Sequence, residues 1–173
     1  MADIRSNFLG IHSPNPFWLA SAPPTDKEIN VTRAFEAGGR GVVWKTLGEE
    51  GPPIVNVNGK RYESLLSDQR RVIGLNNIEL ITDRPLQTNL EEIKRVKRNW
   101  PDRAMIVSLM VPCEEQSWKA ILPLVEDTGA DGIELNFGCP HGIASAAWAR
   151  PWARCPNTSR WSHAGASTTR SCR

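Results

Sequence analysis

Short apolar runs alternate with amphipathic stretches along the first 143 residues of the chain. Four of the apolar runs have the length of buried strands, namely residues 17–20, 41–45, 104–110 and 132–136. Between them lie three stretches in which apolar residues recur every three or four positions, which is the spacing of a helix with one buried face. The pattern predicts four strands that alternate with three helices.

Polar signals predict where the helices begin and end. Residues 25–28 and 88–91 both fit a capping box, in which side chains at a helix start bond to free backbone N–H groups. We expect the first helix to end at residues 37–39 (Ala-Gly-Gly), and the third helix to span residues 114–129. The side chains expected on the buried faces of the second and third helices are Leu90, Ile93, Val96, Trp118, Ile121, Leu122 and Val125.

Two further segments complete the prediction. Residues 4–20 predict a β-hairpin that leads into the first strand, with its turn at the Ser-Pro-Asn-Pro sequence of residues 13–16. A long loop with several Gly, Pro and Asn residues is expected from the end of the second strand to about residue 77. Loops of this length in a compact domain are usually functional.

The order of elements predicts an α/β fold with a parallel sheet and right-handed crossovers. Four strands and three helices correspond to the N-terminal half of a (β/α)8 TIM barrel, preceded by the β-hairpin. A complete barrel needs about 250 residues, so this interpretation makes the chain part of a barrel. A doubly wound sheet is the alternative, but no strand is followed by the Gly-x-Gly-x-x-Gly turn of a dinucleotide-binding fold.

The pattern changes after Ile143. Residues 144–173 contain no Leu, Ile, Val, Phe or Met, yet they hold three Trp and five Arg. They show neither helical nor strand periodicity, and they resemble GC-rich DNA translated out of frame. Restoring one base after the Ile143 codon, with plausible codons, gives ISERGMGAAVGQVPEYIEMVTRWCKHYTR. We therefore predict a partial barrel domain over 1–143 and a non-native, disordered, out-of-frame tail over 144–173; a natural Arg/Trp-rich tail is the alternative.

Composition limits the classes of function. The whole chain has a net charge of +2, but residues 1–143 hold 16 basic and 19 acidic side chains, which argues against nucleic-acid binding. No apolar run approaches the roughly 20 residues of a membrane span. The chain has four cysteines without a CxxC pair and no export signal at its start, so we expect a cytoplasmic protein with free thiols and no metal site.

Candidate chemistry lies where the predicted strands end. In a (β/α)8 barrel the active site is built at the carboxyl ends of the strands and in the loops that follow them. Here these places hold residues 20–23, 45–46 and 136–142, and the loop before the second helix adds 76–79. Lysine and serine side chains can bind a phosphate and an electron-rich ring, asparagine can pair with amide edges, and cysteine can transfer a proton.

Four stretches carry a resemblance to a known family, namely FWLASAP, VVWKT, GLNNIELI and ELNFGCPHG. They resemble the flavin domain of dihydropyrimidine dehydrogenases, which belong to the wider group of dihydroorotate dehydrogenase-like barrels. The resemblance spans nearly all of residues 1–143. It implies a flavin-dependent oxidoreductase that interconverts uracil or thymine with their 5,6-dihydro forms.

The resemblance implies a role for each matching residue. Ala20, Ser21, Lys45 and Thr46 would contact FMN, and Lys45 would stabilise negative charge on the reduced flavin. Asn136 would lie close to the flavin and would also hold the pyrimidine.

On the substrate side, the resemblance implies that Asn77 and Glu79 hold the amide edges of the pyrimidine together with Asn136. Cys139 would be the catalytic acid and base that exchanges a proton at C5. In the full-length family, iron–sulfur clusters are also expected, with NAD and FAD on a partner subunit or domain.

Two other functions are possible for this sequence, one a different enzyme and one without catalysis. Dihydroorotate dehydrogenases typically have Cys-Pro-Asn after the fourth strand, whereas here Cys139 and Pro140 are followed by His141. Glu79 would repel the carboxylate of dihydroorotate, which favours a neutral pyrimidine. The second alternative is an inactive fragment without catalysis, because the barrel's later strands supply further flavin and substrate contacts.

Overall fold

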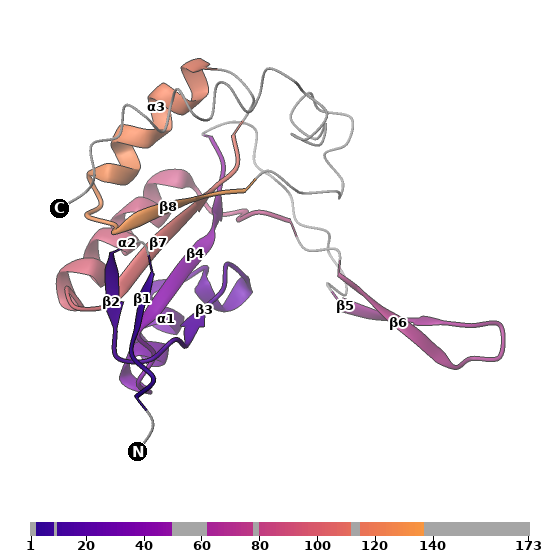
Figure 1. The fold of residues 1–173 in the computed structure, drawn as a ribbon. Helices are drawn as coiled ribbons and strands as arrows, with labels where there is room; N and C mark the ends of the chain where they lie inside the picture. Colours follow the sequence, from indigo (N-terminus) through magenta and orange to yellow (C-terminus); the bar gives the residue numbers. More distant parts are fainter. Residues whose placement is uncertain (1–2, 9, 50–61, 78–79, 112–114, 137–173) are drawn as a thin grey trace.

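A computed structural model describes residues 3–8, 10–49, 62–77, 80–111 and 115–136 (Figure 1). Four strands form one parallel sheet in the order β3-β4-β7-β8. These strands are β3 (Trp18–Leu19), β4 (Gly41–Leu47), β7 (Ala104–Leu109) and β8 (Gly132–Leu135). Each neighbour in this sheet is also the next of the four along the chain. The predicted strands and their parallel pairing are therefore confirmed.

Three helices connect the strands and cover one face of the sheet. They are α1 (Glu28–Glu36), α2 (Leu86–Asn99) and α3 (Glu115–Glu126). Side chains alternate between the two faces of a strand, so Trp44 of β4 and Val107 of β7 point toward the helices. The predicted helix faces pack against them and are confirmed; the buried core is completed by Leu90, Ile93, Val96, Trp118, Ile121, Leu122 and Val125.

The opposite face of the sheet carries different chemistry. By the same alternation, Lys45 of β4 and Ser108 of β7 lie on the face away from the helices. Both are buried, at 3% and 0% exposure. In a closed barrel this face would be the interior. Closure into a (β/α)8 barrel stays a prediction. The boundary at residue 143 and the nature of residues 144–173 also stay predictions. Residues 137–173 lie outside the described residues.

The N-terminal hairpin is present, but its predicted turn is wrong. β1 (Ser6–Phe8) pairs with β2 (Ile11–Ser13), and the chain turns at Gly10, whose φ is +85°. Glycine adopts this left-handed conformation without a steric penalty, and Gly10 N–H donates to Asn7 Oδ1 at 3.0 Å. The Ser-Pro-Asn-Pro segment instead leads from β2 into β3.

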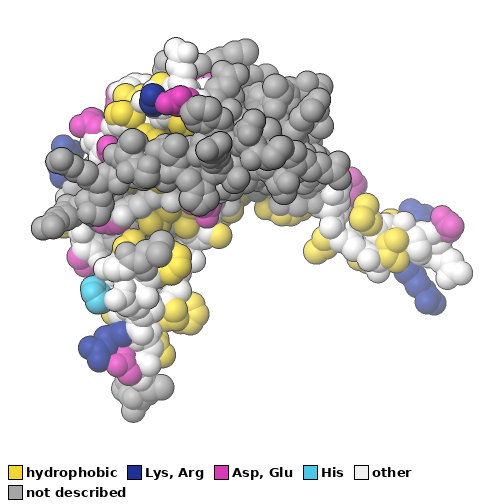
Figure 2. Space-filling model, turned by 45° about the horizontal axis from the view of Figure 1, so that its top comes forward, with side chains coloured by type: hydrophobic (Ala, Val, Ile, Leu, Met, Phe, Trp, Pro, Cys, Tyr) yellow, Lys and Arg dark blue, Asp and Glu magenta, His cyan; other side chains and the backbone are white. Residues whose placement is uncertain are grey.

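A second hairpin occupies much of the segment that was expected to be loop. β5 (Tyr62–Leu66) pairs antiparallel with β6 (Val72–Asn77), and the hairpin projects from the body of the molecule (Figure 1). Its apolar side chains are exposed, from 49% at Leu65 to 79% at Leu75, and they form a hydrophobic group in the space-filling view (Figure 2). Strands without a buried face lack the alternation that identifies strands in a sequence.

Both predicted capping boxes are wrong as helix starts. Thr25 ends the short 3-10 helix η1 (Pro23–Thr25), and α1 begins three residues later without a side-chain cap. The second helix begins at Leu86, before the predicted box, because Pro85 provides the extended residue that precedes it. None of the described helices is both long and apolar enough to cross a bilayer.

Candidate functional site

The carboxyl ends of the four parallel strands meet at one edge of the sheet. Ser21 follows β3, Lys45 and Thr46 lie near the end of β4, Ser108 is the penultimate residue of β7, and Asn136 follows β8. In α/β barrels this edge carries the chemistry. The five side chains come from segments that are far apart in the sequence.

Hydrogen bonds join four of these side chains around the Thr46 hydroxyl. Thr46 Oγ1 lies 3.2 Å from Ser21 Oγ and 2.9 Å from Ser108 Oγ, and it accepts a hydrogen bond from Asn136 Nδ2 at 3.1 Å. The Thr46 backbone N–H donates to Ser21 Oγ at 3.1 Å. The result is a compact, neutral network of donors and acceptors.

Backbone hydrogen bonds hold the network in place. Asn136 N–H donates to the carbonyl of Leu109 at 2.9 Å, which continues the ladder between β7 and β8 beyond the end of β8. Thr82 N–H donates to the Thr46 carbonyl at 2.9 Å and brings the segment before α2 against the site. Thr25 Oγ1 donates to the Ala20 carbonyl at 3.3 Å, and Ala20 itself is exposed.

Lys45 and Asp26 are charged side chains close to this neutral network. Burial raises the pKa of the Asp26 carboxyl, and this effect is only partly offset by a hydrogen bond from Thr82 and by the positive charges of Lys45 and Arg84. Asp26 Oδ1 accepts the Thr82 hydroxyl hydrogen at 2.6 Å. The ammonium of Lys45 thus lies within the field of a carboxylate behind the strand ends.

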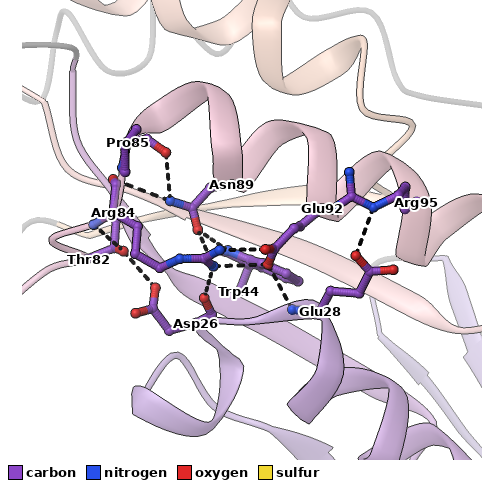
Figure 3. A network of polar contacts seen from close by, with 9 residues as sticks. All are labelled: Asp26, Glu28, Trp44, Thr82, Arg84, Pro85, Asn89, Glu92 and Arg95. Carbon is purple, nitrogen blue, oxygen red and sulfur yellow. Dashed lines mark hydrogen bonds and ion pairs between the residues drawn. The ribbon is translucent and has the colours of Figure 1, made fainter.

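A polar network beside the site connects α1, α2 and the segment before α2 (Figure 3). Arg84 donates to both oxygens of Glu92 and to the Asp26 carbonyl, and the Glu92 carboxylate also accepts the Glu28 N–H at 2.9 Å. Burial acts to raise the pKa of Glu92, but the hydrogen bonds from Arg84 and Glu28, together with the positive charges of Arg84 and Arg95, outweigh it and lower the pKa. This network fixes the helix ends that support Asp26 and Thr82.

The structure unites some of the predicted site residues and leaves others undescribed. Ser21, Thr46 and Asn136 share one hydrogen-bond network, and Lys45 and Ala20 are their chain neighbours. Asn77 is the last residue of β6, paired with Tyr62, and only its backbone is described. Glu79 and Cys139 lie outside the described residues, so their roles stay predictions.

Two residues of the site were missed in the sequence. Ser108 interrupts an otherwise apolar strand at its carboxyl end, a signal that could have identified it. Asp26 was assigned to a helix cap and therefore was not considered for the site. Across the described ranges, no three His, Cys, Asp or Glu side chains gather as ligands of a metal ion would.

No family model matches the chain, but individual proteins do. It is 40% identical over 146 residues to dihydropyrimidine dehydrogenase (NADP(+)), chloroplastic, of Arabidopsis thaliana, with 82% of this chain covered. It is 38% identical over 144 residues to the NAD-dependent dihydropyrimidine dehydrogenase subunit PreA of Escherichia coli K12, with 83% covered. This chain is a relative of the dihydropyrimidine dehydrogenases.

The similarity covers only part of these relatives and also extends, more weakly, to another enzyme family. The chain spans about a third of the length of these dihydropyrimidine dehydrogenases, since the matches cover 34% of each. A weaker similarity reaches the catalytic subunit of dihydroorotate dehydrogenase B (NAD(+)) of Thermoplasma volcanium, at 31% identity over 147 residues. The resemblance seen in the sequence is thereby confirmed, with the dihydropyrimidine dehydrogenases ahead of the dihydroorotate enzymes.

Proposed function

We propose that this chain forms the first half of an FMN-binding barrel in an enzyme that interconverts uracil or thymine with their 5,6-dihydro forms. The observation that carries the proposal is the network of Ser21, Thr46, Ser108 and Asn136 beside buried Lys45, at the edge of the sheet where barrel enzymes place their chemistry. The 38–40% identity to dihydropyrimidine dehydrogenases supports the same conclusion.

The donor set suits a flavin. Ser21 and Thr46 offer hydroxyls, Lys45 offers an ammonium that can oppose negative charge, and the exposed position of Ala20 allows close approach of a ligand. These four residues would hold FMN together with Asn136. The flavin, when bound, supplies hydride transfer, and the protein supplies binding and orientation.

The remaining roles concern the pyrimidine. Asn77, Glu79 and Asn136 would hold its amide edges through paired hydrogen bonds. The thiol of Cys139 would give a proton to C5 or take one from it, because a cysteine pKa lies close enough to neutrality for both directions. Glu79 would also disfavour a substrate that carries a carboxylate.

Further components belong to the same proposal. The complete enzyme would include iron–sulfur clusters, with NAD and FAD on a partner subunit or domain, and would act in the cytoplasm. One relative is named as an NAD-dependent subunit, which supports the expectation of a partner.

Flavin binding is the first test. Titration of the chain with FMN, followed by quenching of flavin fluorescence, should give weak but saturable binding near one equivalent. Ser21→Ala should weaken it, and Ser67→Ala on the exposed β5–β6 hairpin provides a matched control. Absence of saturable binding would contradict the proposal.

Substrate preference is the second test. Residues 1–143 can replace the homologous region of the Escherichia coli relative, and the chimera can be assayed for oxidation of dihydrouracil and dihydroorotate. We expect faster turnover of dihydrouracil and its loss in Cys139→Ala. Preference for dihydroorotate would instead assign the chain to the dihydroorotate enzymes.

A further inference from the structure

The hydrogen bonds around Thr46 limit the direction in which each hydroxyl donates. A hydroxyl can donate one hydrogen bond and accept two. Thr46 Oγ1 accepts one from Asn136 Nδ2, because an amide nitrogen can only donate. One donor and one acceptor capacity therefore remain for its two serine neighbours, Ser21 at 3.2 Å and Ser108 at 2.9 Å.

Ser108 decides between the two possible arrangements. It is fully buried, and its one hydrogen-bond partner within the described part of the chain is Thr46. If Ser108 accepted from Thr46, its own hydroxyl hydrogen would be buried without an acceptor, which is unfavourable. Ser108 therefore donates to Thr46, and Thr46 donates to Ser21.

This order has a consequence for Ser21. Its oxygen accepts both the Thr46 backbone N–H, at 3.1 Å, and the Thr46 hydroxyl, so both of its acceptor positions are used. The hydroxyl hydrogen of Ser21 is left over, and Ser21 is only half-buried, at the open edge of the sheet. Ser21 can therefore meet a ligand only as a donor.

We propose that Ser108 is a positioning residue that acts through Thr46 to make Ser21 a hydrogen-bond donor toward an acceptor atom of the bound flavin. The inference rests on the proposed FMN site. It adds Ser108 to that site and states that Ser21 donates its hydrogen bond to the ligand. Ser108 is fully buried and bonded to Thr46, so it acts on the ligand through the side chains that Thr46 contacts.

The same chain of hydroxyls orients the Asn136 amide. Because Thr46 Oγ1 accepts from Nδ2 of Asn136, the Oδ1 oxygen of that amide is turned away from Thr46. Loss of the Ser108 donor leaves one acceptor position of Thr46 Oγ1 empty, so the Thr46 hydroxyl can rotate and its contact with Asn136 can change. Asn136 thus reports on Ser108 even when no flavin is bound.

Flavin affinity of the full chain gives the first measurement. Ser108→Ala and Ser21→Ala should each weaken FMN binding by about three- to tenfold, the effect of one net hydrogen bond. The double variant should bind only slightly more weakly than Ser21→Ala, because most of the effect of Ser108 passes through Thr46 to Ser21. Ser13→Ala, which removes another buried serine hydroxyl, is the matched control and should leave the affinity unchanged. Equal affinities of Ser108→Ala and Ser13→Ala, or additive losses in the double variant, would overturn the proposal.

The second measurement needs no flavin. In two-dimensional NMR spectra of the ¹⁵N-labelled chain, Ser108→Ala should shift the side-chain amide signals of Asn136 and the Thr46 backbone signal, while Ser13→Ala should not. Ser108→Cys replaces the hydroxyl oxygen with a larger sulfur that is a weaker donor, and it should give an intermediate shift in a folded protein. Unchanged Asn136 signals would overturn the proposal. If the wild-type chain binds no FMN, the proposed function fails, and these signals alone decide whether the hydroxyl chain exists.

Discussion

The two edges of the parallel sheet bury polar side chains in different ways. At the amino-terminal edge, the Asp131 carboxylate accepts the Met105 N–H at 2.8 Å and the Lys97 ammonium at 2.7 Å. At the carboxyl edge, the neutral groups of Thr46 and Ser108 are bonded to one another beside a buried lysine. We expect the paired charges to contribute mainly to stability, and the donors at the carboxyl edge to contribute mainly to the proposed binding site. Barrel enzymes separate stability and chemistry in this way.

The largest effect on stability is expected at the amino-terminal edge. Asp131→Asn removes the charge that faces Lys97, whose ammonium also bonds to the carbonyls of Pro101 and Arg103. The side chains of the pair are 16% and 29% exposed, so the loss should lie between that of a surface pair and a buried one, about 2 kcal/mol. Urea unfolding of both proteins measures it.

An exposed ion pair provides the control for this prediction. Lys94 and Asp127 are 46% and 72% exposed, and Asp127→Asn should change the free energy of unfolding by less than about 0.5 kcal/mol. Equal losses in Asp131→Asn and Asp127→Asn would mean that the amino-terminal edge has no special role in stability.

The second prediction uses pH to separate the scaffold from the site. Glu92, in the network that supports the helices, has a lowered pKa, so its contribution to stability is present above about pH 4.3 and is lost as the pH falls through the folded-state value. Glu92→Gln should therefore flatten the loss of stability in acid. Thermal unfolding between about pH 3 and pH 7 measures this.

Asp26, near Lys45, should show the opposite sign. Burial raises its pKa, so its contribution to stability is present below about pH 3.9 and is lost as the pH rises through the folded-state value. Asp26→Asn should become more stable relative to wild type as the pH rises through this window. If the stability of wild type and of Asp26→Asn changed with pH in the same way, Asp26 would not be desolvated in the folded protein. The predicted opposite pH dependence of Glu92 and Asp26 would then be wrong.

The sequence is sufficient to predict the elements that carry a one-sided or continuous apolar pattern. The strand at 104–110 and the helix that buries Ile93 were both predicted because burial imposes a period on the chain. The helix starts were not, since residues 25–28 and 88–91 have the capping pattern but Pro85 and the η1 turn set the actual boundaries.

The candidate site could be predicted only in part. Ser21, Lys45, Thr46 and Asn136 follow from their places at strand ends together with the family resemblance. The role of Ser108 depends on the register between strands, which brings its hydroxyl within 2.9 Å of Thr46, and no local pattern encodes that register. Hydrogen-bond networks between segments that are distant in the chain are therefore the part of a site that a single sequence does not predict.

A small effect on stability, with the sharpest contrast between the edges, is expected for Lys45→Met. Methionine fills a similar volume, and removal of a buried ammonium relieves its desolvation while it loses the attraction to Asp26, so stability should change by less than about 1 kcal/mol. Because the Lys45 charge acts to lower the pKa of Asp26, the variant should also move the Asp26 transition to higher pH. FMN affinity, measured on the same preparation, should fall at least about tenfold, since an opposing charge is lost from a buried site. A large loss of stability with unchanged flavin affinity would reverse the assignment and make Lys45 part of the scaffold.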